Sequence, residues 1–120
     1  MSKEYKIDLP WPPSINHYYA RRKGGGTRLD DKARDYRINV KVRVLTAKRI
    51  ATMTGRIGVI IECYPPDKRK RDIDNLPKGV LDGLTHAGIW EDDAQVDELI
   101  LRRMRIEKGG RITVTIQEQS

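Results

Sequence analysis

The chain has 120 residues, of which 34% are charged and 38% hydrophobic, and this composition predicts one soluble globular domain spanning residues 1–120. No apolar run approaches the roughly 20 residues that cross a bilayer, which excludes a membrane-spanning helix. Twenty-four lysines and arginines against 17 acidic residues give a net charge of +7, which favours a polyanionic partner without requiring one.

The first predicted element is a strand at residues 4–9, EYKIDL, where Tyr5, Ile7 and Leu9 alternate with polar residues. No apolar segment of the signal-peptide type precedes it, and a single Cys63 leaves no partner for an internal disulfide. Both observations favour a cytoplasmic protein.

Residues 14–29, SINHYYARRKGGGTRL, follow neither the helical nor the strand period and contain three glycines. This composition predicts a mobile basic loop. The candidate DNA contacts in this loop are Arg21, Arg22 and Lys23.

A helical period fits residues 31–51, with Asp30 or Asp31 as a plausible N-cap. One stripe of this helix is apolar, and a second, about a quarter-turn away, is cationic. The cationic stripe either follows a phosphate backbone or is simply solvated, which is the commoner case. The apolar stripe comprises Ala33, Tyr36, Val40, Val44, Ala47 and Ala51, and the cationic stripe comprises Arg34, Arg37, Lys41 and Lys48.

The segment RIGVIIECY predicts a central strand that ends at Pro65-Pro66. A short helix is then predicted over NLPKGVLDGLTHAG, with Asp74 or Asn75 at its cap, Pro77 in its first turn and Gly88 just beyond its end.

Residues 96–106 and 111–117 flank a glycine-containing turn and are predicted to form a hairpin. The predicted order is therefore strand, loop, helix, strand, helix, strand, strand. This order indicates a mixed α/β (α+β) fold with one mixed sheet and two helices.

The segment PPDKRKRDIDN places four consecutive cations, Lys68 to Arg71, directly before Asp72 and Asp74. In an extended segment, residues two apart point to the same side. Two adjacent carboxylates repel each other unless a cation lies between them, and oxygen ligands beside a phosphate suit Mg²⁺. The pattern alone is weak, because two aspartates at this spacing also occur in ordinary loops and caps.

A second acidic group, Glu91 to Asp93, precedes the strand predicted at residue 96. If that strand pairs near the end of the one that stops at Tyr64, a third carboxylate could reach the same ion. At least one of these three residues is expected to bond its own backbone in a turn. Lys78, one helical turn after Asp74, could hold a phosphate or a water, or form a simple i,i+4 ion pair.

These motifs resemble the RusA family of Holliday junction resolvases, small endonucleases typical of phages and prophages. The resemblance is carried by LPWPPSINHYY near the start, RDIDNLPKGVLDGLTHAGIWEDDAQV in the middle and KGGRITVTI near the end. It implies a homodimer that binds four-way DNA junctions and cuts two opposed strands symmetrically with Mg²⁺. The catalytic positions that it implies are Asp72, Asp74, Asp93 and Lys78, with the three aspartates as metal ligands.

The DNA contacts expected around this motif are Lys68, Arg69, Lys70, Arg71 and Asn75. We expect no membrane partner and no small-molecule cofactor. Two alternatives stay open: a non-catalytic basic DNA-binding module, and a Mg²⁺-dependent nuclease that acts on flaps or forks. The metal site depends on one geometric expectation, that the three aspartates converge on a shared ion.

Overall fold

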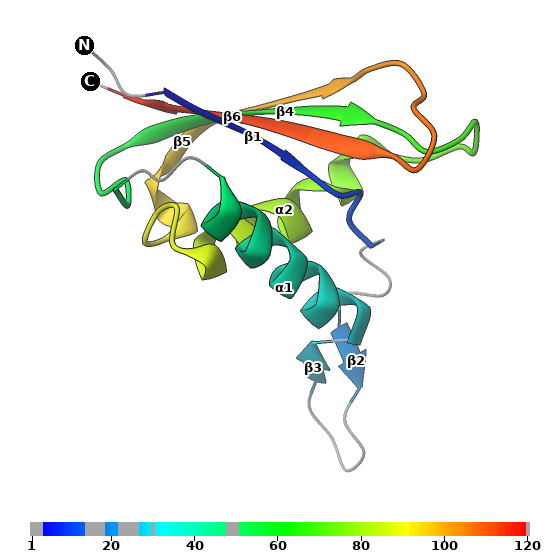
Figure 1. Cartoon of the computed structure of the whole chain (residues 1–120), viewed down its shortest axis with the longest axis horizontal. Coiled ribbons are helices and arrows are strands. Elements are labelled where there is room, and N and C mark those ends of the chain that lie inside the picture. The colour runs from blue at the N-terminus through cyan, green and yellow to red at the C-terminus, as the bar shows by residue number, and fades with distance from the viewer. Residues whose placement is uncertain (1–3, 14–18, 22–26, 30, 48–50, 120) are drawn as a thin grey trace.

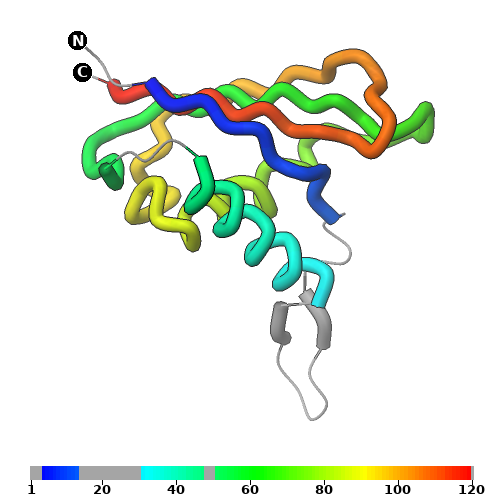
Figure 2. Tube along the Cα trace, in the orientation of Figure 1, coloured from blue at the N-terminus to red at the C-terminus, as the bar shows by residue number. Residues whose placement is uncertain are grey.

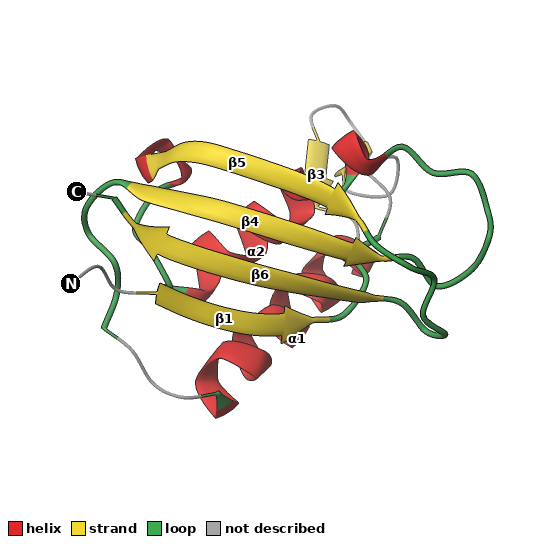
Figure 3. Cartoon of the chain, turned by 90° about the horizontal axis from the view of Figure 1, so that it is seen from above, coloured by secondary structure: helices red, strands yellow, loops and turns green. Residues whose placement is uncertain are grey.

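The computed structural model describes residues 4–13, 19–21, 27–29, 31–47 and 51–119. Its main sheet has four strands in the order β1-β6-β4-β5, and both helices lie against one face of this sheet (Figures 1 and 3). The strands are β1 (Glu4–Leu9), β4 (Ile57–Tyr64), β5 (Val96–Arg103) and β6 (Arg111–Glu118), and the helices are α1 (Asp31–Thr46) and α2 (Pro77–Ala87). The predicted mixed fold with two helices is confirmed. None of the helices in these ranges has the length and apolar character of a membrane span.

The predicted hairpin between residues 96 and 117 is wrong, because β4 lies between β5 and β6. β4 pairs with β5 in parallel and with β6 in antiparallel fashion. β4 is buried along nearly its whole length, so it needs a neighbouring strand on each edge. The glycine turn itself is present, since Gly110 donates a backbone hydrogen bond to Glu107 (2.8 Å), but the connection that contains it passes around the end of β4.

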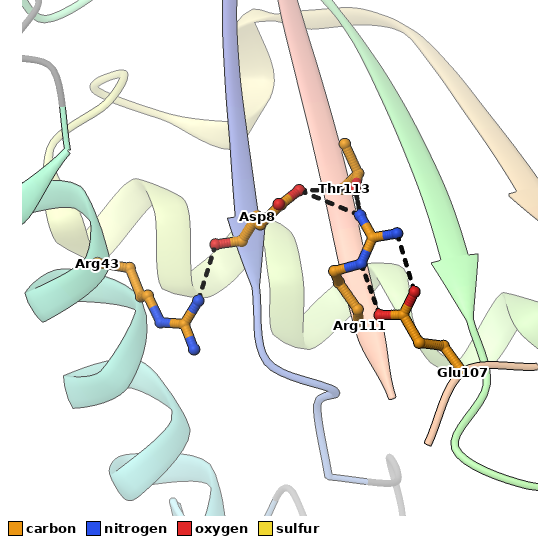
Figure 4. Close-up of polar contacts among 5 residues, drawn as sticks. All are labelled: Asp8, Arg43, Glu107, Arg111 and Thr113. Atoms are coloured by element: carbon orange, nitrogen blue, oxygen red, sulfur yellow. Dashed lines mark hydrogen bonds and ion pairs between the residues drawn. The ribbon is translucent and has the colours of Figure 1, made fainter. Parts of the chain in front are cut away.

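A polar network anchors this connection to the sheet (Figure 4). The Arg111 guanidinium donates to both carboxylate oxygens of Glu107 (2.8 and 3.2 Å), to Asp8 (3.4 Å) and to Thr113 (2.7 Å). The same guanidinium lies 3.9 Å from the centre of the Tyr64 ring. Its hydrogen bonds lower the pKa of Glu107 below the ordinary value. One arginine therefore joins β1, β6, the end of β4 and the glycine turn.

The core lies between the sheet and the two helices. The chain trace shows β1 beside β6 at one edge of the sheet (Figure 2), and the predicted alternation of β1 is confirmed, with every second residue buried. Helix α1 approaches α2 closely at Gly83, where an added Cβ would lie 3.1 Å from Val40 Cγ2. The largest fully buried side chain of the core is Trp90, which is 1% exposed.

Helix α1 ends at Thr46, about one turn earlier than predicted, and Ala51 is exposed outside it. The first part of the predicted apolar stripe is confirmed, since Ala33, Tyr36 and Val40 are buried. Of the predicted cationic stripe, Arg34 pairs with Asp31 and Arg37 pairs with Asp82 of α2. Lys41 is exposed, and Lys48 lies outside the described residues. The two arginines thus serve intramolecular contacts.

The loop predicted over residues 14–29 contains two short strands, β2 (Tyr19–Arg21) and β3 (Thr27–Leu29), which pair with each other. The loop prediction is wrong for these residues, because backbone pairing needs no hydrophobic alternation in so short a ribbon. The remaining residues of this segment lie outside the described part of the chain.

The start of α2 also differs from the prediction. Asp74 and Asn75 belong to a short 3₁₀ turn, Ile73–Asn75, and the N-cap position is held by Leu76 without a side-chain hydrogen bond. Pro77 is the first residue of the helix, as predicted, and Gly88 ends it in the left-handed conformation (φ 85°). The two polar side chains are therefore not used as helix caps.

Candidate active site

The segment that carries the first acidic pair lies where parallel strands β4 and β5 both end. β4 stops at Tyr64, and Arg103, the last residue of β5, donates a hydrogen bond to the Arg71 carbonyl (2.6 Å). Figure 3 shows the short helical turn before α2 close to the arrowhead of β5. Ligand sites of sheets with parallel strands commonly form at this carboxyl edge.

The four cations of this segment do not form one uniform group, because Asp67 binds two of them. Arg71 donates to the Asp67 carboxylate (2.8 Å) and is only 23% exposed. The Arg69 backbone N–H donates to the same carboxylate (2.9 Å), and the Arg69 guanidinium lies 3.8 Å from it. Hydrogen bonding to Arg71 and Arg69 lowers the pKa of Asp67. Lys68, Arg69 and Lys70 remain exposed, so they are the cations best placed to meet a phosphate.

Asp67 is a residue that sequence reasoning missed. Its spacing from Arg71 was no signal, because pairing four residues apart is a rule for helices and residues 67–71 form no helix. Because Asp67 already binds its guanidinium, Arg71 is less available than its neighbours to contact a phosphate. Its guanidinium lies over the Trp11 ring, 5.8 Å from the centroid.

Asp72 and Asp74 are both exposed. Within the part of the chain that the structure describes, neither carboxylate has a hydrogen-bond or ion-pair partner. The backbone is extended at Asp72 but belongs to a 3₁₀ turn at Asp74, so the expected run of extended residues stops between them. Asn75 is exposed in the same turn, and Lys78 is exposed in the first turn of α2. The carboxylates of Asp72 and Asp74 therefore lie, exposed, next to several exposed cationic side chains.

Asp93 lies elsewhere in the chain. Its carboxylate accepts hydrogen bonds from Thr85, near the C-terminal end of α2, and from Trp90 Nε1 (3.2 Å). Asp93 precedes β5, whereas Arg71 contacts the far end of that strand. The eight residues of β5, at about 3.3 Å per step, place the two ends of this strand roughly 23 Å apart.

The expectation that three aspartates converge within one chain is therefore wrong, and the reason is the direction of β5. Val96, its first residue, pairs with Ile57 at the opposite end of β4 from Tyr64. Among the described residues, no group of three or more acidic, histidine or cysteine side chains is placed to hold a metal.

One expectation about the second acidic group is confirmed. Asp92 caps the 3₁₀ turn η3 (Asp93–Gln95) by accepting a hydrogen bond from the Ala94 N–H (2.8 Å). The buried Gln95 side chain accepts from the backbone N–H groups of Glu91 (2.7 Å) and Asp92 (2.9 Å). Asp92 is thus a turn residue, while Glu91 contributes its backbone to the same turn.

The chemistry of the Asp72 and Asp74 pair fits Mg²⁺, which prefers oxygen ligands and often takes only one or two carboxylates, with water and phosphate oxygens completing its shell. Cys63 does not suit a catalytic role, because it is fully buried and burial raises the pKa of its thiol to about 11. Of the other predicted DNA contacts, Arg21 ends β2, and Arg22 and Lys23 lie outside the described residues.

Comparison with known proteins gives a consistent result. Residues 10–117 match the sequence model of the family described as Endodeoxyribonuclease RusA. Two bacterial proteins named Crossover junction endodeoxyribonuclease RusA, from Shigella sonnei strain Ss046 and Escherichia coli strain K12, are each 44% identical over 95% of this chain and 94% of their own length. A protein of the same name from Enterobacteria phage 82 is 43% identical over the same shares. The chain therefore belongs to the RusA family of endodeoxyribonucleases.

Proposed function

We propose that this protein is a Mg²⁺-dependent endonuclease that resolves four-way DNA junctions by paired, symmetric nicks, and that it acts in the cytoplasm, where bacteria and their phages recombine DNA. The observation that carries the proposal is the exposed pair Asp72 and Asp74, which has no partner in the described residues and adjoins exposed cations at the carboxyl edge of parallel strands. Membership of the RusA family and the names of the relatives support it.

Asp72 and Asp74 would hold the metal. When bound, Mg²⁺ supplies charge neutralisation at the phosphate and a water of lowered pKa. Lys78, in the first turn of α2, would orient the scissile phosphate. The exposed residues Lys68, Arg69 and Lys70 contact neighbouring phosphates and hold the strand in register. Arg71 and Asn75 complete the site, and Arg21, Arg22 and Lys23 are proposed as more distant DNA contacts.

A homodimer would reconcile the role of Asp93 with its position. A two-fold axis across the middle of α2 exchanges the two ends of this helix between subunits. The partner subunit's Asp93 would then lie near Asp72 and Asp74, although the two sets are far apart within one protomer. Two-fold symmetry also suits a four-way junction, because one interface presents two sites to equivalent strands.

Mixed dimers test this arrangement. Asp74→Asn and Asp93→Asn subunits, each inactive alone, are co-expressed with different tags, and the heterodimer is purified. If each site combines two subunits, one of its two sites keeps all three aspartates, and the heterodimer nicks one strand of the junction. If Asp93 acts within its own subunit, both sites are damaged and the heterodimer stays inactive, which would contradict the shared site.

The activity itself is tested with a synthetic four-way junction, incubated with and without Mg²⁺. Paired symmetric nicks that require the metal are expected. Folded protein that binds the junction without cutting it would instead indicate a non-catalytic DNA-binding module. Faster cutting of matched flap or fork substrates would keep the nuclease but reject the junction as its preferred substrate.

A further inference from the structure

A hollow of about 390 Å³ opens beside the acidic pair, and its chemistry differs from that of a phosphate site. One side is apolar, and the other is cationic and polar. Its volume is in the lower part of the range for small-molecule pockets, roughly 300–1,000 Å³. The hollow is lined by Trp11, Pro12, Lys70, Arg71, Asp72, Asn75 and Leu76.

The apolar wall of the hollow, at Trp11, packs against Gly110. Gly110 approaches Trp11 so closely that an added Cβ would lie 2.9 Å from Trp11 Cβ and 3.3 Å from Pro66 Cβ. Gly110 also adopts a positive φ of 76°, which favours glycine at this position. Trp11 itself stays partly exposed, whereas Pro12 is buried. Trp11 is thus packed closely against Gly110 at its Cβ, and its side chain lines the hollow.

The polar side is fixed by the contacts of Arg71. Asp67 binds its guanidinium, and the same guanidinium lies over the Trp11 ring. Arg71 is therefore already neutralised, and its planar group borders the hollow as a surface for stacking. Asn75, exposed in the turn before α2, carries both a hydrogen-bond donor and an acceptor on its amide.

We propose that this hollow binds one unpaired nucleobase of the DNA substrate, adjacent to the phosphate at Asp72. Unpaired bases are bound by stacking on aromatic rings and guanidinium planes and by hydrogen bonds to their edges. The walls formed by Trp11, Arg71 and Asn75 offer these contacts. Lys70, on the rim, suits the phosphate attached to such a base. The inference rests on the proposed function and deepens it.

The consequence concerns where the strand is cut. A base pair at an open branch point has lost a stacking neighbour, so moving one of its bases out of the helix costs less there than inside a continuous duplex. Seating that base in the hollow, against Trp11 and Arg71, fixes the neighbouring phosphate at Asp72. Paired bases in an intact duplex cannot enter without first being unstacked, so the hollow favours branched DNA.

Intrinsic fluorescence provides a direct test, because the chain has two tryptophans and the other, Trp90, is 1% exposed. Wild-type protein is titrated with a four-way junction and with matched duplex, both without divalent ions so that no cutting occurs. Quenching by the junction beyond that by the duplex is expected, and Trp11→Phe, which reports Trp90 alone, should show none. Equal signals from wild type and Trp11→Phe would overturn the inference.

A second measurement removes the base instead of the ring. Junctions with a single abasic site at successive positions around the cut are compared for binding to wild type, Trp11→Phe and Trp11→Leu. At one position, loss of the base should weaken wild-type binding roughly tenfold. The same loss should weaken binding to Trp11→Phe, which retains a ring, and should have little effect on Trp11→Leu, which fills space without one.

The two measurements separate this inference from the function on which it rests. Wild-type protein must first cut the intact junction with Mg²⁺, since failure there would reject the proposed function. If cutting occurs but no abasic position distinguishes Trp11→Leu from wild type, the base-binding role is rejected and the nuclease stands.

Discussion

The two ends of α2 use acidic residues in opposite ways. Before its N-terminus, Asp72 and Asp74 are exposed and have no partner within the described residues. Near its C-terminus, Asp93 accepts hydrogen bonds from Thr85 and Trp90. A carboxylate that stabilises nothing in the fold costs charge repulsion unless a ligand uses it. The contrast is between exposed carboxylates without a partner, which the proposed function assigns to the metal, and a carboxylate that supports the structure.

The contrast predicts, first, that Asp74→Asn removes activity and leaves stability unchanged. A metal contributes several kcal/mol to stabilising the transition state, so junction cleavage should fall by at least about 100-fold. Thermal melting should stay within about 1 °C of wild type, because no partner is lost. Cleavage rate and melting temperature are measured on the same preparation. A large drop in melting temperature would show that Asp74 supports the fold after all.

A substitution in the middle of α2 should have the opposite effect, lowering stability while cleavage is retained. Gly83→Val forces new atoms against Val40 of α1, where even a Cβ lies 3.1 Å away. Overpacking of this kind costs about 1–3 kcal/mol, measured as a lower urea midpoint, while cleavage at low temperature is retained. Gly55→Ala serves as the matched control, because an added Cβ there meets nothing within 4 Å. Equal midpoints for the two variants would contradict the tight packing.

Asp93 should combine both effects, and two variants separate them. Asp93→Ala removes the acceptor for Thr85 and Trp90 and should lower stability by about 1 kcal/mol. Asp93→Asn keeps an oxygen that can accept those bonds, so its stability should stay near wild type. Under the proposed function, both lose cleavage. Urea unfolding and the junction assay, run side by side, check this, and full activity in Asp93→Asn would remove Asp93 from the site.

The smallest effect concerns Asp67 and pH. Hydrogen bonding to Arg71, and to the Arg69 backbone, lowers the pKa of Asp67 in the folded protein. A carboxyl group whose pKa is lower in the folded than in the unfolded protein stabilises the fold when the pH is above its unfolded pKa, near 4. That stabilisation is lost as the pH falls below this value. The stability difference between wild type and Asp67→Asn should therefore shrink between pH 6 and pH 3. Urea midpoints at both pH values measure it, and a difference that stays constant would contradict the pairing.

Much of the fold follows from local sequence signals, and the exceptions have different causes. Alternation in β1, the apolar run of β4 and the proline and glycine around α2 all act within a few residues, so each predicted element exists. The hairpin prediction failed because strand order depends on which partner best buries β4, which is a non-local choice. The start of α2 was misjudged because Asp74 and Asn75 form a turn of their own.

In the candidate site, too, the sequence showed what lies within one short segment and missed what depends on the fold. The motif around Asp72 and Asp74 was visible in the sequence, since both residues sit in one short segment. The placement of Asp93 was not, because it depends on β5 running parallel to β4. The role of Asp67 was equally hidden, since its charge looked like one more member of a charged run. The sequence suggested a role for each of these groups, and only the fold could show which of them lie together.

The strand order described above also bears on how the protein is made. β6, the last strand along the described chain, lies between β1 and β4. While the ribosome is still synthesising residues 111–118, β1 has no neighbour in the main sheet, and β4 lacks one of its two. The sheet cannot close from its N-terminal side during translation, so the nascent chain must keep its first strand available until the final one emerges.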